Sequence, residues 1–186
     1  MLDVAVIGSG IKGAALAALL AHVDGVRVTG YEAGDGPGGA TVTNHGRLHL
    51  GTAGFDSDST SLMQRRLLGS RTWRALGVGS RQPPGIYVFD EPETLARFEK
   101  SCEAVGIPAR PARAVPTDWV GTPYAAVELP EYGFAPAAVA RHLRAHAEEA
   151  GARWVDRSRV LSVAPTCDGL RLHHTDGDDV HDVVVN

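Results

Sequence analysis

The stretch VIGSGIKGAALAALL, residues 6–20, decides the fold of this 186-residue chain. A short β-branched segment, LDVAVI at residues 2–7, leads into its glycines, and an Ala- and Leu-rich segment at 11–22 follows them. The first segment is typical of a buried parallel strand and the second of a helix, and VRVTGY at 26–31 resembles a second strand. The sequence therefore predicts a strand, a tight turn, a helix and a parallel strand. The glycines of the turn are Gly8, Gly10 and Gly13.

The glycine spacing, and an acid at the end of the second strand, indicate a dinucleotide site. Gly8 permits the tight turn, the missing Cβ of Gly10 lets a pyrophosphate approach the main chain, and Gly13 lets the helix pack on the strand. The first amides of the helix then face the diphosphate. Glu32, about 20 residues further on, can accept hydrogen bonds from both ribose hydroxyls and disfavours a 2′-phosphate. The alternative is a glycine-rich turn that binds no ligand.

The residues after Glu32 favour FAD over NAD. EAGDGPGG at 32–39 runs into ATVTNHGRLHLG at 40–51, where an NAD domain would carry another compact strand and helix. A glycine-rich passage suits a backbone that lies along a long cofactor, past its pyrophosphate and towards an isoalloxazine ring. An NAD-dependent dehydrogenase stays open as an alternative.

The rest of the chain alternates between helical and extended segments. Residues 77–85, with two prolines, and the Pro-rich residues 107–123 predict irregular structure. Helices are expected at 56–76, 92–106 and 136–152, and strands at 85–90, 124–130, 159–165, 169–174 and 182–186.

Composition excludes several classes of protein. The net charge of −4 argues against sequence-independent nucleic-acid binding. The longest apolar run, residues 14–21, is too short to span a bilayer, and no signal peptide precedes it. Cys102 and Cys167 form no CxxC pair, which predicts that the protein resides in a reducing cytoplasm. Only Lys12 and Lys100 are lysines among 18 basic residues, a skew that indicates a GC-rich bacterial genome.

The segments at 3–21 and 26–52 resemble the FAD-dependent oxidoreductases of the D-amino-acid oxidase and glycerol-3-phosphate dehydrogenase superfamily. The likeness is strongest to the large subunit of anaerobic glycerol-3-phosphate dehydrogenase and to 2-hydroxyglutarate oxidases, and NHGRLHLG at 44–51 is its most particular part. It implies an α/β fold: a Rossmann-like FAD-binding domain, with a parallel sheet in three layers, interrupted by a partial antiparallel substrate domain. The expected ranges are 1–77 and 133–186 for the FAD-binding domain and 78–132 for the start of the substrate domain.

The resemblance also implies roles for single residues. The glycine loop would hold the pyrophosphate, Glu32 the adenosine ribose, and the main chain of Val160 the adenine edge. The residues expected to bind FAD are Gly8, Gly10, Ile11, Gly13, Glu32, Ala33, Gly39, Ala40, Thr41, Asn44, His45, Gly46 and Val160. The implied reaction is removal of hydride from a carbon that bears a hydroxyl or an amine of a small-molecule substrate, with delivery to flavin N5. Glycerol-3-phosphate dehydrogenases carry an Arg where this chain has Ala53 or Gly54, so glycerol 3-phosphate is not the expected substrate.

His45 and His49 are the candidate catalytic residues. An imidazole near flavin can act as a base or stabilise charge on the reduced ring, and His45 can also link covalently to it. The alternative is that both side chains only hydrogen-bond their loop. His142 and His146 have helical metal-ligand spacing but no third ligand, so no metal is predicted, and His173 and His174 are interpreted as structural.

The chain ends at VVVN, where members of the superfamily continue into a second glycine-containing loop and the rest of the substrate domain. Three interpretations stay open. The enzyme consists of two polypeptides, which we favour; the chain is a truncated or inactive form; or it is a minimal module that binds FAD without turning over substrate.

Overall fold

The computed structural model describes residues 1–44, 46–48, 59–75, 80–113 and 124–186, which form two compact units. Met1–His45 and Ala135–Asn186 make the first unit, and Gly46–Phe134 make the second. The second unit is thus inserted within the sequence of the first. The domain boundaries expected at 77/78 and 132/133 stay a prediction, because compactness alone does not define the domains of the whole protein.

The first unit is built on a parallel sheet with the strand order β11-β1-β2-β7. β1 (Leu2–Ile7) pairs with β2 (Val26–Tyr31) on one side and with β11 (Val183–Val185) on the other, while β2 also pairs with β7 (Arg153–Val155). The β-branched residues of these segments suit strands that are covered on both faces.

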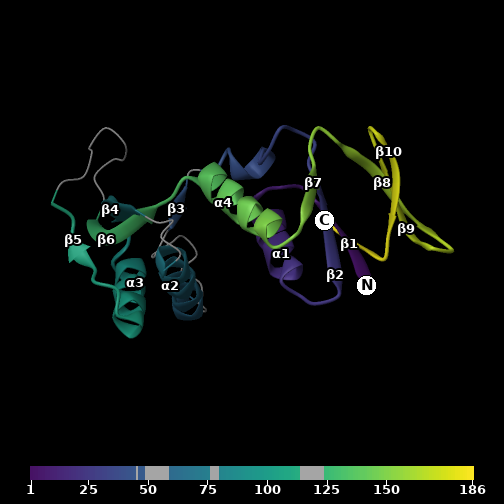
Figure 1. Ribbon diagram of the computed structural model, residues 1–186. Helices are drawn as coiled ribbons and strands as arrows, with labels where there is room; N and C mark the ends of the chain where they lie inside the picture. The colour runs from purple at the N-terminus through teal and green to yellow at the C-terminus, as the bar shows by residue number, and fades with distance from the viewer. Residues whose placement is uncertain (45, 49–58, 76–79, 114–123) are drawn as a thin grey trace. The chain divides into compact units, whose positions relative to one another are not determined.

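Two helices cover one face of this sheet (Figure 1). α1 (Ile11–Ala21) and α4 (Pro136–Glu149) place small side chains such as Ala17 and Ala147 against Val4, Val6 and Val28 of the sheet. Ala17 and Ala147 are fully buried, so the two helices lie close to the strands and to each other. Alanine favours helix formation and leaves room for this close approach.

An antiparallel meander covers the other face of the sheet (Figure 1). It consists of β8 (Val160–Thr166), β9 (Gly169–His174) and β10 (Gly177–His181), in the order β10-β9-β8. Leu172 of β9 packs against Ala5 and Tyr31 of the parallel sheet, and all three are buried. Helices, parallel sheet and meander make three layers, which confirms the predicted fold class.

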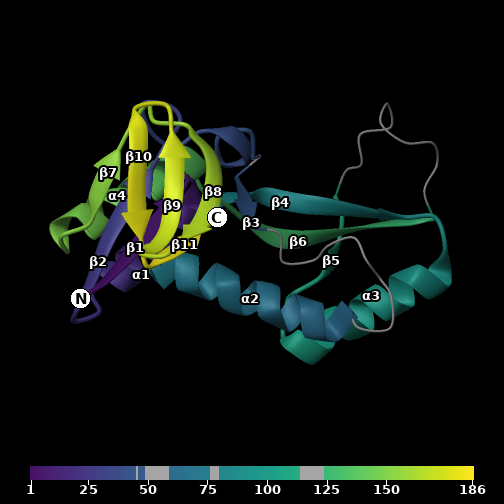
Figure 2. The ribbon, with the colours of Figure 1, turned by 90° about the vertical axis from the view of Figure 1, so that its right-hand side faces the viewer.

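The second unit combines an antiparallel sheet with two helices (Figure 2). Its sheet has the order β3-β6-β4, and β5 also pairs with β6. Met63, Phe89, Phe98, Cys102 and Leu129 are buried in its core. The elements of this unit are β3 (Arg47–Leu48), α2 (Ser59–Ala75), β4 (Ser80–Phe89), α3 (Pro92–Val105), β5 (Arg110–Pro111) and β6 (Ala125–Gly133).

Several parts of the described chain differ from the sequence-based expectation, among them β5, which lies in the Pro-rich segment 107–123 that was expected to be irregular. Residues 80–85 were expected to be irregular but begin β4, because the register shifts between Gln82 and Gly85 and so accommodates the two prolines. β4 is also a terminal strand of its sheet, where missing amide donors are tolerated. β7 and β10 were not predicted, since β7 has only three residues and β10 is the acidic segment GDDVH.

Two absences hold for the described residues. No helix among them is long and apolar enough to cross a membrane. No group of three or more His, Cys, Asp or Glu side chains in those ranges is arranged to hold a metal ion.

Arg144 of α4 contacts β7 and the residue that follows it through an ion pair and a ring contact. Its Nη1 and Nη2 donate to Oδ1 and Oδ2 of Asp156 at 2.6 and 2.8 Å, and its guanidinium lies 5.0 Å from the ring centroid of Trp154. Only 15% of the Arg144 side chain is exposed, so solvent weakens this pair less than an open surface pair.

Arg144→Ala should therefore destabilise the protein by about 2 kcal/mol, through loss of a bidentate ion pair and of ring packing. The matched control is Arg141→Ala, an exposed arginine of the same helix, which should change stability by less than ~0.5 kcal/mol. Urea unfolding of both variants measures the difference. Equal midpoints for the two variants would show that the Arg144 pair contributes nothing.

Candidate functional site

The glycine loop between β1 and α1 is closed by main-chain contacts. Gly8 has φ +90°, in the region that favours glycine, and its N–H donates to the Tyr31 carbonyl at 2.8 Å. A Cβ on Gly13 would lie 2.0 Å from the Gly8 carbonyl oxygen, so only glycine permits the helix to approach the strand this closely. A Cβ on Gly8 would meet nothing within 4 Å, which leaves this side of the loop unobstructed.

The amino end of α1 is held by a side chain from the following loop. Gly10 is the N-cap residue and offers no side chain, and the Ile11 N–H instead donates to Thr41 Oγ1 at 3.1 Å. Thr41 belongs to a short 3-10 turn, η1 (Gly39–Thr41), of the glycine-rich passage. The chain from 39 to 41 is thereby fixed beside the helix end, where the main-chain amides favour a bound anion.

Glu32 is tied to the glycine loop from the end of the neighbouring strand. Its Oε2 accepts hydrogen bonds from the N–H and the hydroxyl of Ser9 at 2.8 and 2.7 Å, and its Oε1 accepts the Gly34 N–H at 3.0 Å. Burial raises the pKa of Glu32, but the hydrogen bonds from Ser9 and Gly34 outweigh it and lower the pKa below its usual range. Glu32 is therefore an anion at neutral pH.

Several sites expected from the sequence come together in the first unit. Gly8, Gly10, Ile11, Gly13, Glu32 and Thr41 surround one end of α1 through the contacts above. Ala33 and Ala40 are exposed, and Gly39 has φ +55°. Val160 is half-buried at the start of β8 and packs against the core around Tyr31.

The catalytic candidates cannot be placed with this group. His45 and His49 lie outside the described residues. Asn44 is exposed in the first unit, and Gly46, with φ +66°, belongs to the second, where its carbonyl accepts the Phe134 N–H at 2.7 Å.

Sequence reasoning missed two serines that contact Glu32. Ser9 and Ser158 are both fully buried, and the Ser158 N–H donates to the Glu32 carbonyl at 2.8 Å. The variable position between the first two glycines could have drawn attention to Ser9. Ser158 follows a strand that was not predicted, so no pattern in the sequence pointed to it.

A hollow of about 590 Å³ lies beside the loop after Glu32, but its lining differs from the glycine loop in charge. Its lining includes Arg144, which is already paired with Asp156 and Glu148. The other lining residues are Asp35, Gly36, Pro37, Arg141 and Ala145. Mixed and internally paired charges do not favour an anionic ligand there, whereas the helix amides at the glycine loop do.

One protein family matches nearly all of the chain. The family described as "FAD dependent oxidoreductase" (DAO) matches residues 3–186. The chain belongs to this family. The resemblance to FAD-dependent oxidoreductases inferred from residues 3–21 and 26–52 is thereby confirmed, and the cofactor of the family is FAD. No curated protein sequence matches the chain.

Several solved structures share the fold at low sequence identity. Glycine oxidase from Geobacillus kaustophilus is 20% identical with a TM-score of 0.71, and 99% of this chain covers 55% of that one. L-proline dehydrogenase from P. horikoshii is 20% identical with a TM-score of 0.70, and 100% of this chain covers 52% of that one. L-alpha-glycerophosphate oxidase from Mycoplasma pneumoniae, solved with FAD bound, is 15% identical with a TM-score of 0.72. The match covers 98% of this chain and 52% of that one. The chain thus spans about half the length of these structures.

Thr41→Val tests the contact that holds the amino end of α1. The variant keeps the shape of the side chain but loses the acceptor for the Ile11 N–H, so we expect a loss of about 1 kcal/mol in unfolding free energy. Thr43→Val is the matched control, because the Thr43 hydroxyl is exposed and donates to Gly39 at 3.3 Å in the same turn. Denaturant unfolding measures the unfolding free energy of both variants. A larger loss of stability in Thr43→Val than in Thr41→Val would contradict the role assigned to Thr41.

Proposed function

We propose that this chain is the FAD-binding part of an enzyme that oxidises a CH–OH or CH–NH group. The observation that carries the proposal is the Glu32 carboxylate, fixed by Ser9 beside the amino end of α1. This arrangement offers an anion site for a diphosphate and an acceptor for a sugar hydroxyl within one loop system. Bound flavin would supply a hydride acceptor at N5.

Different residues of the site would bind different parts of FAD. The first amides of α1 would hold the diphosphate, and Glu32 would accept ribose hydroxyls. Thr41 would keep the passage 39–41 against the helix end through the Ile11 N–H. The main chain at Val160, which begins β8, would border the adenine.

The groups that would act on the substrate are proposed from the sequence. We propose that at least one of His45 and His49 faces the flavin and acts as a proton acceptor or stabilises charge on the reduced ring. A glycine oxidase and an L-alpha-glycerophosphate oxidase are among the similar structures, which supports a proposed substrate class that spans CH–NH and CH–OH groups. Ala53 and Gly54 offer no cation for a substrate phosphate, and glycerol 3-phosphate is therefore not the proposed substrate.

We further propose that a second polypeptide completes the enzyme. Its support is that the similar structures are about twice as long and that apolar side chains are exposed in the first unit. Leu161 and Val163 of β8 are 55% and 41% exposed, and Val183 of the terminal strand β11 is 36% exposed. A reducing cytoplasm stays the proposed compartment, and Cys102 and Cys167 are free thiols.

One experiment separates the proposal from its alternatives. The native protein is purified, its absorbance spectrum and mass-spectrometric composition are recorded, and a panel of hydroxy acids and amino acids is added anaerobically. Yellow protein with a co-purifying polypeptide, bleached by one substrate, is the expected result. Yellow protein that no substrate bleaches, alone or with the second polypeptide, would indicate a non-catalytic FAD-binding module. Colourless protein that binds NAD would overturn the proposal in favour of an NAD-dependent dehydrogenase.

A further inference from the structure

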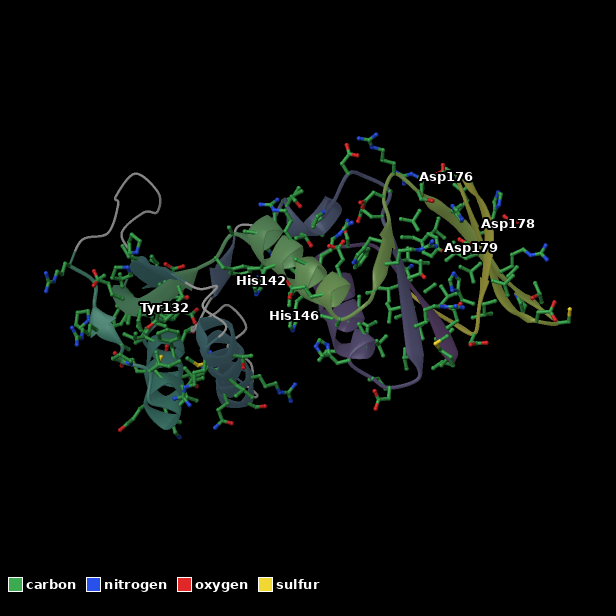
Figure 3. All side chains as sticks on the ribbon, viewed as in Figure 1. Tyr132, His142, His146, Asp176, Asp178 and Asp179 are labelled. Atoms are coloured by element: carbon green, nitrogen blue, oxygen red, sulfur yellow. The ribbon has the colours of Figure 1, made fainter. Side chains whose placement is uncertain are left out.

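A polar network, buried except for the half-exposed Asp179, joins the parallel sheet to the meander. The hydroxyl of Tyr31, at the end of β2, donates to Asp179 Oδ2 of β10 at 2.6 Å and lies 2.9 Å from His181 Nε2. Asp179 Oδ2 is also 3.2 Å from His174 Nε2 of β9. Figure 3 shows Asp179 on the meander. Tyr31, His174 and His181 are at most 7% exposed, so these groups depend on one another for hydrogen bonds.

The contacts of His174 fix which of its nitrogens carries the proton. The Asp179 carboxylate can only accept, so His174 Nε2 is the donor in that pair. Nδ1 is then an acceptor, and it receives the Asp176 N–H at 3.4 Å and the Ser158 hydroxyl at 2.6 Å. His174 therefore orients the Ser158 hydroxyl.

Ser158 is the link from this network to the candidate cofactor site. It is fully buried, and its N–H donates to the Glu32 carbonyl at 2.8 Å. The preceding residue, Arg157, has φ +56° and donates its N–H to the Gly34 carbonyl at 2.9 Å. Two successive amides thus bind the carbonyls of Glu32 and Gly34. Arg157 adopts a left-handed backbone conformation that is uncommon for a non-glycine residue.

We propose that His174 is a positioning residue for the adenosine half of the cofactor site. By accepting a hydrogen bond from the Ser158 hydroxyl, His174 keeps the main chain at 157–160 against Glu32. The Glu32 carboxylate and the main chain at Val160 are thereby positioned to bind the ribose and the adenine of the same nucleoside. The inference rests on the proposed placement of adenosine at Glu32 and Val160. It adds a residue that lies behind the site and does not touch the ligand.

The test separates the two hydrogen bonds of the imidazole. His174→Leu removes both, His174→Asn keeps an acceptor near Nδ1 for Ser158, and His174→Gln keeps a donor near Nε2 for Asp179. Binding of FAD and of ADP, which carries only the adenosine diphosphate half, is measured by calorimetry, with the folded fraction checked by circular dichroism. His173→Leu is the matched control, because His173 is the exposed neighbour on β9 that pairs with Asp178.

We expect His174→Leu to weaken ADP and FAD by about tenfold each, since a buried hydroxyl loses its acceptor. His174→Asn should recover most of that loss, His174→Gln should not, and His173→Leu should bind as the unmodified protein does. Ser158→Ala gives a second variant with a smaller structural change and should weaken ADP similarly, without adding to the His174→Leu effect.

The outcomes distinguish this inference from the proposed function. If Glu32→Ala weakens ADP while His174→Leu and Ser158→Ala do not, the adenosine site stands and the role of His174 is overturned. The same holds if His174→Gln recovers binding better than His174→Asn. If neither ADP nor FAD binds the unmodified protein, the proposed function fails, and the inference fails with it.

Discussion

Gly13→Ala should unfold the glycine loop and cost about 3 kcal/mol of stability. The new Cβ would lie 2.0 Å from the Gly8 carbonyl oxygen, 3.1 Å from its carbon and 3.5 Å from Val6 Cγ1. Two of these three atoms are main chain, so the helix must move away from the strand and no side-chain rotation can relieve the clash. Because domains of this size are stable by only ~5–15 kcal/mol, the loss is a large part of the total.

Two other glycines supply the controls for this variant. A Cβ on Gly10 would meet Thr41 Oγ1 at 2.7 Å, an atom that can rotate away, so Gly10→Ala should be milder than Gly13→Ala. Gly69 in α2 has nothing within 4 Å, and Gly69→Ala should stabilise the protein by about 1 kcal/mol. Thermal and urea unfolding of the three variants give the order. A Gly13→Ala protein as stable as the Gly69→Ala protein would contradict the loop geometry.

Glu32→Ala should lower FAD affinity on the order of 100-fold, because hydrogen bonds to an ionised carboxylate are among the stronger ones. Glu32→Gln keeps one acceptor oxygen and should lose about tenfold. Calorimetric titration with FAD measures both, and Glu99→Gln, an exposed acid on α3, is the control. If Glu32→Ala binds FAD with unchanged affinity, Glu32 does not bind the ribose, and the central argument for the proposed function fails.

The same residue predicts a pH dependence of stability. The hydrogen bonds from Ser9 and Gly34 lower the pKa of Glu32 in the folded protein, against about 4.3 in an unfolded chain. The contribution of Glu32 is therefore complete above the unfolded pKa and is lost as pH falls through the folded pKa. Glu32→Gln should flatten the stability profile below about pH 4.3, and an unaltered acid slope would show that the Ser9 contacts are not made in solution.

The sequence predicts those parts of the fold that are set by local pattern. The first strand, helix and second strand match β1, α1 and β2, because the glycine spacing and β-branched runs leave few alternatives. α3 and α4 also start as predicted, at Pro92 and Pro136, where proline suits the first turn. Their apolar residues recur at helical spacing and end in the cores of the two units.

Contacts between distant segments could not be predicted in this way. β7 is too short to show a period, yet its pairing with β2 brings Ser158 to the Glu32 carbonyl. β10 has the acidic sequence GDDVH, and only the partners Tyr31, His174 and His181 explain why Asp179 lies in a strand. The acid at position 32 was thus evident from the sequence, but the serines that hold it became evident only from the fold.

The position of β1 between β2 and β11 has a consequence for biosynthesis. β1 leaves the ribosome well before one of its two neighbours, Val183–Val185, because the whole of the second unit lies between them in the sequence. The second unit, Gly46–Phe134, is contiguous and can fold while translation continues, whereas the first must wait with β1, α1 and β2 exposed. Until Val183–Val185 are synthesised, one edge of the nascent strand β1 therefore lacks its native partner.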